Sequence, residues 1–277
     1  MNIRPNDFVL EIGSGHNPKT RSDVLCDKFI EDNEQRGGKI VTDRPTVEAD
    51  GQFLPFSDKA FDYVICSHVL EHVEAPDLLI SELMRVATRG YIETPSEIGE
   101  RIYGWQYHNW VVNLIDGKLV LQKNKRNSQF GQLFHTLALN DKYWKRFHIT
   151  HHHLFLIQYE WEGNINYVIS DDEDSVLDLK CEQTIEHLLN STDSKKQNGF
   201  SVILKSMIPR KIVSHAKSVL AKQRIRKKTP LEDILVCPQC KSKVLWYEQD
   251  LHCNKCEHRY PIINGIPRFT HTSTGNL

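Results

Sequence analysis

The chain has 277 residues, which is enough for a full α/β core and a second small domain. Its 35 basic and 36 acidic residues nearly cancel, so the overall charge does not select a nucleic acid, a membrane or an acidic substrate as a partner. We expect a cytoplasmic protein, because the N-terminus shows no leader and no apolar run approaches the ~20 residues of a membrane-spanning helix.

Strand-like segments alternate with helical stretches over the first hundred residues. The predicted strands are 8–12, 23–26, 47–49, 61–66 and 90–93. A helix is predicted for 76–87, because Pro76 suits a first helical turn and Leu79, Leu83 and Val86 recur at helical spacing. This alternation predicts an α/β fold with a Rossmann-like, doubly wound, mostly parallel sheet. Ligands of such sheets bind at the carboxyl ends of the strands.

The first predicted strand runs into two glycines spaced one apart, Gly13 and Gly15. A nucleotide can approach a backbone this closely only where no Cβ intervenes. Acidic residues stand at the carboxyl ends of three predicted strands, namely Glu11, Asp27 and Asp50. Single carboxylates at such positions often cap the next helix. Three of them after a glycine turn favour nucleotide binding, with ribose on Asp27 and adenine near Asp50.

Three motifs in this order resemble the class I S-adenosylmethionine-dependent methyltransferases, above all the branch called methyltransferase domain 11. The motifs are EIGSG at 11–15, DGQFLPF at 50–56 and FDYVICSHVLEH at 61–72, and the resemblance covers about 7–97. It implies that S-adenosylmethionine is the cofactor and that His68 lies beside its methyl-bearing sulfonium. The implied cofactor-binding residues are Glu11, Gly13, Gly15, Asp27, Asp50, Gly51, Gln52, Ser67 and His68.

The link after the glycine turn departs from the usual pattern. Only eight residues separate Gly15 from Val24, and Asn17-Pro18 stands where a further glycine and a helix would be expected. A crossover with a full helix needs at least ~10–12 residues. We therefore expect one helical turn or none here. This argues against a dehydrogenase, which needs a third glycine that packs a full helix on the sheet.

Methyl transfer requires that donor and acceptor are aligned and, for a hydroxyl acceptor, that a base removes a proton. The candidate catalytic residues are His68, Tyr107 and His108, and Glu71 and His72 are further candidate bases. The i, i+4 spacing of His68 and His72 could also suggest a metal pair. The H-E-x-x-H motif is absent and no third ligand is apparent, so we favour a pocket-lining role for this pair.

The residues after the fourth strand bear on the acceptor. Methyltransferases that act on adenine or glutamine carry Asn or Asp and then Pro-Pro-Tyr there, whereas this chain has SHVL at 67–70. This argues against N-methylation of a base and leaves O-methylation, C-methylation or N-methylation of another amine. A cap rich in aromatic residues and histidines, at about 97–170, should recognise the acceptor. We predict two hairpins in it, 110–122 and 154–169, with His151, His152 and His153 on a strand edge.

Charge is segregated in the following segment. Residues 171–193 carry a net charge of −7 and residues 195–228 a net charge of +11, which is typical of a surface connector. Apolar residues at helical spacing predict a basic amphipathic helix that runs to about 222. A basic helix over 205–228 is compatible with peripheral membrane contact or with binding of phosphates. We favour a helix that packs its apolar face on its own protein.

Two C-x-x-C pairs near the C-terminus predict a structural Zn²⁺ site. Its four thiolate ligands would leave no coordination position open for a catalytic water. The ligands are Cys237, Cys240, Cys253 and Cys256. In a module of about forty residues the metal supplies much of the folding free energy. The segment 231–269 resembles a family of small zinc-ribbon proteins that activate methyltransferases acting on tRNA, rRNA and release factors. This resemblance implies a stabilising or substrate-positioning role in cis.

These features predict four parts of the chain. They are a methyltransferase domain with its cap at 1–170, a connector at 171–230, a four-cysteine zinc ribbon at 231–270 and a tail at 271–277. The predicted function is S-adenosylmethionine-dependent O-methylation of a small molecule or a saccharide. Two alternatives stay open. One is a translation-linked methyltransferase that acts on RNA or protein through the basic connector and the ribbon, although nucleic acid is not the favoured partner. The other is a non-catalytic protein that binds a cofactor or a partner.

Overall fold

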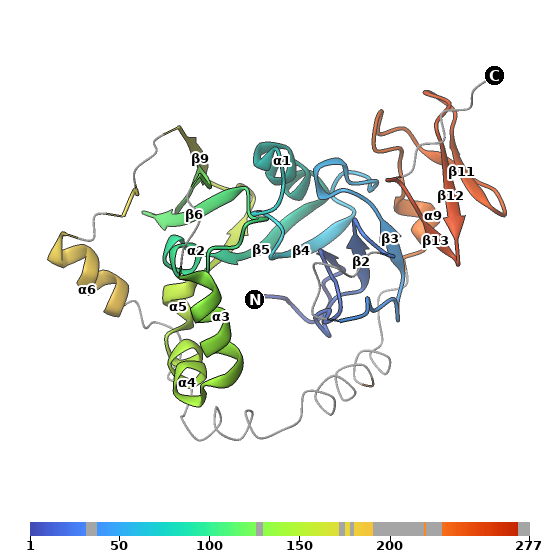
Figure 1. The fold of residues 1–277 in the computed structure, drawn as a ribbon. Helices are drawn as coiled ribbons and strands as arrows, with labels where there is room; N and C mark the ends of the chain where they lie inside the picture. The colour runs from blue at the N-terminus through green and yellow to red at the C-terminus, as the bar shows by residue number, and fades with distance from the viewer. Residues whose placement is uncertain are drawn as a thin grey trace.

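A six-stranded sheet in the order β3-β2-β1-β4-β5-β8 forms the centre of the molecule (Figure 1). The computed structural model describes residues 1–31, 38–125, 130–171, 175–177, 180–190, 219 and 229–270. All neighbours in the sheet are parallel except β8, which runs antiparallel to β5 at the edge. The strands are β1 (Val9–Ile12), β2 (Val24–Asp27), β3 (Thr46–Glu48), β4 (Phe61–Ser67), β5 (Ala87–Pro95) and β8 (Leu156–Glu162). The predicted α/β fold with a mostly parallel sheet is confirmed.

The strand order changes direction between β1 and β4, and this places the candidate site. β2 and β3 extend the sheet on one side of β1, and β4 and β5 extend it on the other. In open α/β sheets the crevice at such a switch point, outside the carboxyl ends of the strands, is where ligands bind. The apolar run of β1 is buried along its whole length, as expected for a central parallel strand.

The link from β1 to β2 contains no helix in residues 13–23, all of which the structure describes. Instead, the amide of Gly13 donates to the carbonyl of Cys26 at 2.9 Å and the amide of Asp23 donates to the carbonyl of Val9 at 2.8 Å. The expectation that this crossover is too short for a full helix is confirmed.

Helix α1 (Pro76–Val86) forms where the periodicity predicts a helix. Pro76 occupies its first turn, and Leu79, Leu83 and Val86 are buried against the sheet. The helix ends one residue before the predicted end, because Ala87 already has extended backbone and begins β5. A short 3-10 helix, η1 (Gly51–Phe53), packs beside α1.

The first hairpin of the cap is confirmed. β6 (Trp110–Ile115) pairs with β7 (Lys118–Lys123) in antiparallel register. Asp116 and Gly117 have φ values of 49° and 73°, which a two-residue hairpin turn of type I′ requires.

The second predicted hairpin is wrong. β8 adds to the edge of the central sheet beside β5, whereas β9 (Tyr167–Ser170) pairs in parallel with β7. Only a bridge between Glu162 and Asn164 spans the turn within the described part of the cap. The turn at Gly163 therefore carries the chain from one sheet to the other, because each strand finds a free edge elsewhere.

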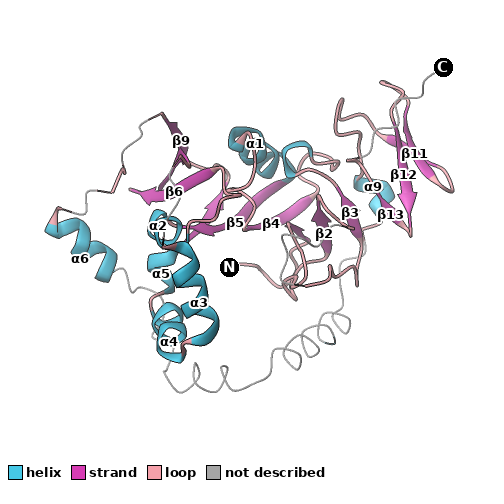
Figure 2. Cartoon of the chain, viewed as in Figure 1, coloured by secondary structure: helices cyan, strands magenta, loops and turns pink. Residues whose placement is uncertain are grey.

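The histidine run of the cap lies between and within two helices, with His151 in the turn after α4 (Lys142–Thr150), so the prediction of a strand edge is wrong. His152 and His153 lie in α5 (His152–Phe155), and β8 begins only at Leu156. Figure 2 shows α5 in one helical group with its neighbours. The other members of this group are α2 (Glu97–Tyr103), α3 (Gly131–Asn140) and α4 (Lys142–Thr150).

The C-terminal segment forms a four-stranded sheet preceded by the short helix α9 (Leu231–Ile234). Its antiparallel strands are β10 (Val244–Trp246), β11 (Asp250–Cys253), β12 (Arg259–Ile263) and β13 (Ile266–Pro267). Backbone hydrogen bonds join it to the central domain. The amide of Ser57 donates to the carbonyl of Ile234, and the amide of Phe269 donates to the carbonyl of Glu48, each at 2.8 Å.

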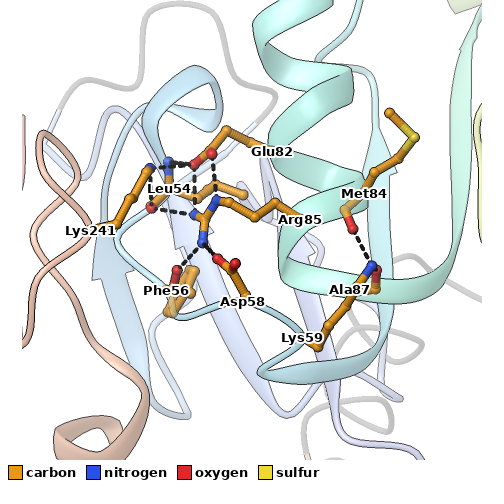
Figure 3. A network of polar contacts seen from close by, with 9 residues as sticks. All are labelled: Leu54, Phe56, Asp58, Lys59, Glu82, Met84, Arg85, Ala87 and Lys241. Atoms are coloured by element: carbon orange, nitrogen blue, oxygen red, sulfur yellow. Dashed lines mark hydrogen bonds and ion pairs between the residues drawn. The ribbon is translucent and has the colours of Figure 1, made fainter.

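A polar network holds the C-terminal segment against α1 (Figure 3). Lys241 donates through Nζ to Oε2 of Glu82 at 2.8 Å and to the carbonyl oxygen of Leu54 at 3.2 Å. Arg85 donates to both carboxylate oxygens of Glu82 and also to Asp58. The segment therefore packs on the central domain as one continuous core, with a charged contact at its rim.

The connector is described only in part. Helix α6 (Glu182–Asn190) lies in the acidic segment, whereas the predicted basic helix over 205–228 lies outside the described residues, apart from Val219. Within the described part of the chain, every helix is too short or too polar to cross a membrane.

Candidate active site

The glycine turn lies at the carboxyl end of β1, at the switch point of the sheet. Gly13 and Gly15 have φ values of 68° and 53°, in the left-handed region that favours glycine. A Cβ at Gly13 would lie 2.3 Å from Cγ2 of Val69, so a side chain cannot be added without displacing the loop after β4. The amide of Gly15 donates to Oδ2 of Asp27 at 2.9 Å. This hydrogen bond and the one from the Gly13 amide to the carbonyl of Cys26 fix the turn.

The predicted acidic residues lie at or just beyond the carboxyl ends of β1, β2 and β3, where each accepts hydrogen bonds from nearby loops. Glu11 accepts hydrogen bonds from the Lys19 amide at 2.8 Å and from the hydroxyl of Ser22, and burial raises the pKa of Glu11 to about 7. Asp27 accepts from the amides of Gly15 and Phe29. The buried carboxylates thus hold the site in shape.

Asp50 caps η1, which is the capping role that the sequence left open. Its Oδ1 accepts from the amide and the side-chain nitrogen of Gln52, and its Oδ2 pairs with Nζ of Lys28 at 2.7 Å. Burial opposes ionisation of Asp50, but the contact with Lys28 and the hydrogen bonds from Gln52 together outweigh it and lower the pKa of Asp50. Gly51 packs so closely that a Cβ would lie 2.9 Å from Cδ1 of Leu79.

A hollow of about 230 Å³ adjoins Asp50. It lies between the central domain and the C-terminal segment, and its lining residues are Lys28, Asp50, Phe53, Pro238, Gln239, Phe269 and Thr270. Sequence reasoning missed the contribution of the C-terminal segment to this edge, since no local pattern shows where a second domain docks.

Ser67 and His68 lie at the carboxyl end of β4. The hydroxyl of Ser67 donates to Oε1 of Glu93 at 2.9 Å. His68 has a φ of 56° and a half-exposed side chain that reaches two carboxylates. Its Nδ1 lies 3.4 Å from Oε1 of Glu71, and its Nε2 lies 3.8 Å from Oε1 of Glu93. Burial lowers the pKa of His68, but these two carboxylates outweigh it and raise the pKa.

Glu93 is a site residue that sequence reasoning missed. It ends a predicted strand, so the rule that selected Glu11, Asp27 and Asp50 could have found it as well. Its carboxylate also accepts from Tyr91 at 2.5 Å and from Gln158 at 2.8 Å. These hydrogen bonds outweigh the effect of burial and lower the pKa of Glu93.

Tyr107 and His108 lie next to His72, on the cap side of the crevice. The rings of His72 and Tyr107 are stacked at 5.5 Å, and those of His72 and His108 meet edge to face at 4.6 Å. His108 is buried, and its Nδ1 lies 2.5 Å from Oε1 of Glu100. Sequence reasoning missed Glu100, which α2 brings to His108.

The structure groups His72 with Glu71 and His108, and not with His68 at the i, i+4 spacing. Side-chain ligand atoms of Glu71, His72 and His108 all lie within 4.8 Å of one another, and His68 is not a member of this group. Burial lowers the pKa of His72, and the nearby His108 adds to this effect.

The four cysteines of the C-terminal segment converge as the C-x-x-C spacing predicts. The Sγ atoms of Cys237 and Cys256 lie 3.4 Å apart, as do those of Cys240 and Cys253. All four sulfur atoms lie within 4.8 Å of one another. A compact set of four thiols fits a tetrahedral Zn²⁺ ion, whose bonds to sulfur are about 2.3 Å long.

Two parts of the chain match known protein families. Residues 25–92 match the methyltransferase domain family, and residues 228–265 match the Trm112p-like proteins. No curated protein matches the chain.

Three of the similar solved structures illustrate the likeness. The YcgJ protein of Bacillus subtilis is 20% identical over 34% of this chain and 47% of its own, with a TM-score of 0.28. An S-adenosylmethionine-dependent methyltransferase of Methanosarcina mazei is 15% identical over 34% and 55%, with a TM-score of 0.26. A chain of the complex that contains the Trm112 methyltransferase activator of Haloferax volcanii is 18% identical over 34% and 47%, with a TM-score of 0.27.

The match spans about half the length of these solved structures. The two family matches and the parallel sheet with its glycine turn agree with the sequence motifs. The chain combines a methyltransferase domain of the methyltransferase domain 11 type with a Trm112p-like zinc-ribbon segment.

Proposed function

We propose that the chain is an S-adenosylmethionine-dependent methyltransferase that methylates a hydroxyl oxygen of a small molecule or a saccharide. One observation carries this proposal. The glycine turn at Gly13 and Gly15 opens toward the same end of the sheet as His68. A cofactor held on the turn would therefore present its methyl group toward His68 and the cap.

The residues present fit such a cofactor. The left-handed turn lets a ligand approach the backbone, and the predicted ribose and adenine residues, Asp27 and Asp50, follow the neighbouring strands. When bound, the cofactor supplies a methyl group already activated on a sulfonium. The chain then has to bind and orient the two reactants and remove one proton.

The proton acceptor that we propose is His68. Its imidazole lies between the carboxylates of Glu71 and Glu93, which stabilise the protonated ring once it has taken the proton of the acceptor hydroxyl. Tyr107 is 47% exposed and stacks on His72, so it offers a face against which a ring or sugar can pack. These side chains support a hydroxyl acceptor of modest size.

A second candidate is a methyltransferase that acts on RNA or protein. It is favoured by the Trm112p-like match at 228–265. The chain just after this match packs beside the edge strand β3, where the amide of Phe269 donates to the carbonyl of Glu48. This candidate uses the zinc ribbon as part of the surface that receives the substrate.

The proposal is tested by following a deuterated methyl group. The full chain is incubated with a cell extract and S-adenosylmethionine that carries a CD₃ group, and small molecules, RNA and protein are analysed separately by mass spectrometry. Label in the small-molecule fraction supports the proposal, and label in RNA or protein supports the second candidate. Calorimetric binding of S-adenosylhomocysteine without label in any fraction would leave the non-catalytic alternative, and absence of binding would contradict the methyltransferase assignment.

A further inference from the structure

Three side chains with metal-binding atoms converge on the cap side of the crevice. Glu71 and His72 follow β4, and His108 comes from the segment between α2 and β6. Their ligand atoms lie within 4.8 Å of one another. Two imidazoles and one carboxylate form a ligand set that binds Zn²⁺ and similar divalent ions while leaving coordination positions open.

The Glu71 carboxylate has an oxygen without a hydrogen bond. Glu71 is 1% exposed, and its Oε2 accepts from the hydroxyl of Thr94 at 3.0 Å. Within the described part of the chain nothing hydrogen-bonds to its Oε1, and the nearby His68 Nδ1 is 3.4 Å away. Besides this contact with His68, Oε1 keeps lone-pair directions free beside the imidazoles of His72 and His108, so it can serve as a metal ligand together with them.

The third ligand is oriented by a carboxylate of its own. Nδ1 of the buried His108 lies 2.5 Å from Oε1 of Glu100, which is 3% exposed. A proton on Nδ1, shared with Glu100, leaves Nε2 as the nitrogen with a free lone pair. Carboxylate–histidine pairs of this kind orient the imidazole and strengthen it as a ligand in metal sites.

We propose that Glu71, His72 and His108 bind one divalent transition-metal ion such as Zn²⁺, separate from the ion of the four-cysteine site. Ligand atoms around a tetrahedral Zn²⁺ lie roughly 3.4 Å apart. The side chains therefore draw together by rotation when the ion binds. Three protein ligands leave at least one position for a further oxygen ligand.

The role of the ion rests on the proposed function. The open position takes the hydroxyl of the acceptor and lowers its pKa, as a bound divalent ion does for water. The hydroxyl loses its proton to His68, its oxygen forms the bond to the methyl carbon, and the methyl–sulfur bond breaks to leave a neutral thioether. This arrangement places the ion on the acceptor side and the glycine turn on the cofactor side.

Metal content of the full chain tests the site. After equilibration with excess Zn²⁺ and gel filtration, the wild type should retain two equivalents, and His72→Ala and His108→Gln should retain one. In a zinc titration, Glu100→Gln should lower the affinity for the second Zn²⁺ ion about 10–100-fold, because it removes the carboxylate that orients His108. His151→Gln is the matched control, since it changes a histidine outside the group, and it should retain two equivalents.

Cobalt gives a readout that does not depend on the variants. The four-cysteine site should bind Co²⁺ with strong thiolate charge-transfer bands, and the second equivalent should add weak visible bands without them. A wild type that saturates at one equivalent, or a second equivalent that persists in both His72→Ala and His108→Gln, would overturn the proposal.

Binding of S-adenosylhomocysteine, measured in parallel, separates the two hypotheses. If the nucleoside binds but the second metal does not, the metal site is wrong and the proposed cofactor site stands. If the second metal binds but the nucleoside does not, the metal site stands and the proposed function is wrong.

Discussion

The two halves of the crevice satisfy their buried carboxylates in different ways. On the glycine-turn side, Glu11, Asp27 and Asp50 accept hydrogen bonds from their own loops. On the cap side, Oε1 of Glu71 and Oε2 of Glu100 accept none from the described residues, although both side chains are buried. In the proposed site, the carboxylates of the cofactor half thus brace their own loops, whereas Glu71 and Glu100 of the acceptor half each have one buried oxygen without a hydrogen bond from the described residues.

The largest effect expected in the cofactor half follows from replacing a glycine of the turn. Gly13→Arg adds a Cβ at a φ of 68°, 2.3 Å from Cγ2 of Val69, and fills the turn with a long side chain. We expect the affinity for S-adenosylhomocysteine to fall by more than about a hundredfold, or about 2.7 kcal/mol. Calorimetry measures the affinity.

The matched control for the turn is Gly117→Ala. Gly117 also has a positive φ, but a Cβ there meets nothing within 4 Å. This variant should bind S-adenosylhomocysteine with unchanged affinity. Wild-type affinity in Gly13→Arg would remove the glycine turn from the binding site.

A substitution in the acceptor half should lower kcat and leave the affinity for the cofactor unchanged. His68→Asn removes the imidazole between Glu71 and Glu93. Loss of a general base lowers kcat by about 10²-fold or more. The affinity for S-adenosylhomocysteine should stay within about twofold of the wild type. Unchanged kcat in this variant would contradict the division of roles between the two halves.

Removal of zinc tests whether the C-terminal segment supports the cofactor half. Chelation should unfold the four-cysteine segment and separate Pro238 and Gln239 from the hollow at Asp50. Each kcal/mol of stability lost in this way lowers the melting midpoint of a domain of this size by about 2–4 °C. Thermal melts with and without chelator measure this change, and an unaltered midpoint would show that the segment contributes nothing to stability.

We expect the free energy of unfolding to depend on pH through the buried Glu11. Burial raises its pKa from 4.5 to about 7 in the folded protein. The protonated carboxyl therefore contributes its full stability below pH 4.5, and this contribution is lost as the pH rises through 7. At about 1.4 kcal/mol per pKa unit, the free energy of unfolding falls by about 3 kcal/mol. Glu11→Gln should be more stable than the wild type at pH 8 by about this amount and equal to it near pH 4.5.

Urea unfolding at the two pH values measures the effect of Glu11→Gln. Glu162→Gln, which changes an exposed carboxylate, serves as the control and should not alter the pH dependence. If Glu11→Gln unfolds with the same pH dependence as the wild type, Glu11 is not the group that titrates.

The smallest change in stability is expected for the charged contact between the C-terminal segment and the central domain. Lys241→Met removes the contact with Glu82, which is partly exposed to solvent. Screening limits such a contact to about 0.5–1 kcal/mol of stability. Urea unfolding of Lys241→Met against Lys243→Met, which lies two residues away, measures the difference. A loss equal in both variants would mean that the contact with Glu82 adds no stability.

The sequence by itself determined the elements that local chemistry encodes. Apolar runs and helical spacing define β1 to β5 and α1, and the Asp116-Gly117 turn defines the first hairpin. Two C-x-x-C pairs define the thiol cluster, and the eight residues after Gly15 are too few for a helix. Each of these features depends on residues that are close in the chain, so turn chemistry and periodicity suffice to predict them.

Only the tertiary structure decided which distant segments meet. His72 and His108 are 36 positions apart in the sequence, and no pattern in it pairs them or brings Glu100 to His108. The separate partners of β8 and β9, and the docking of Lys241 on Glu82, likewise depend on which sheet edge or helix face is free. Such contacts are set by packing of the whole chain and have no signature in local sequence.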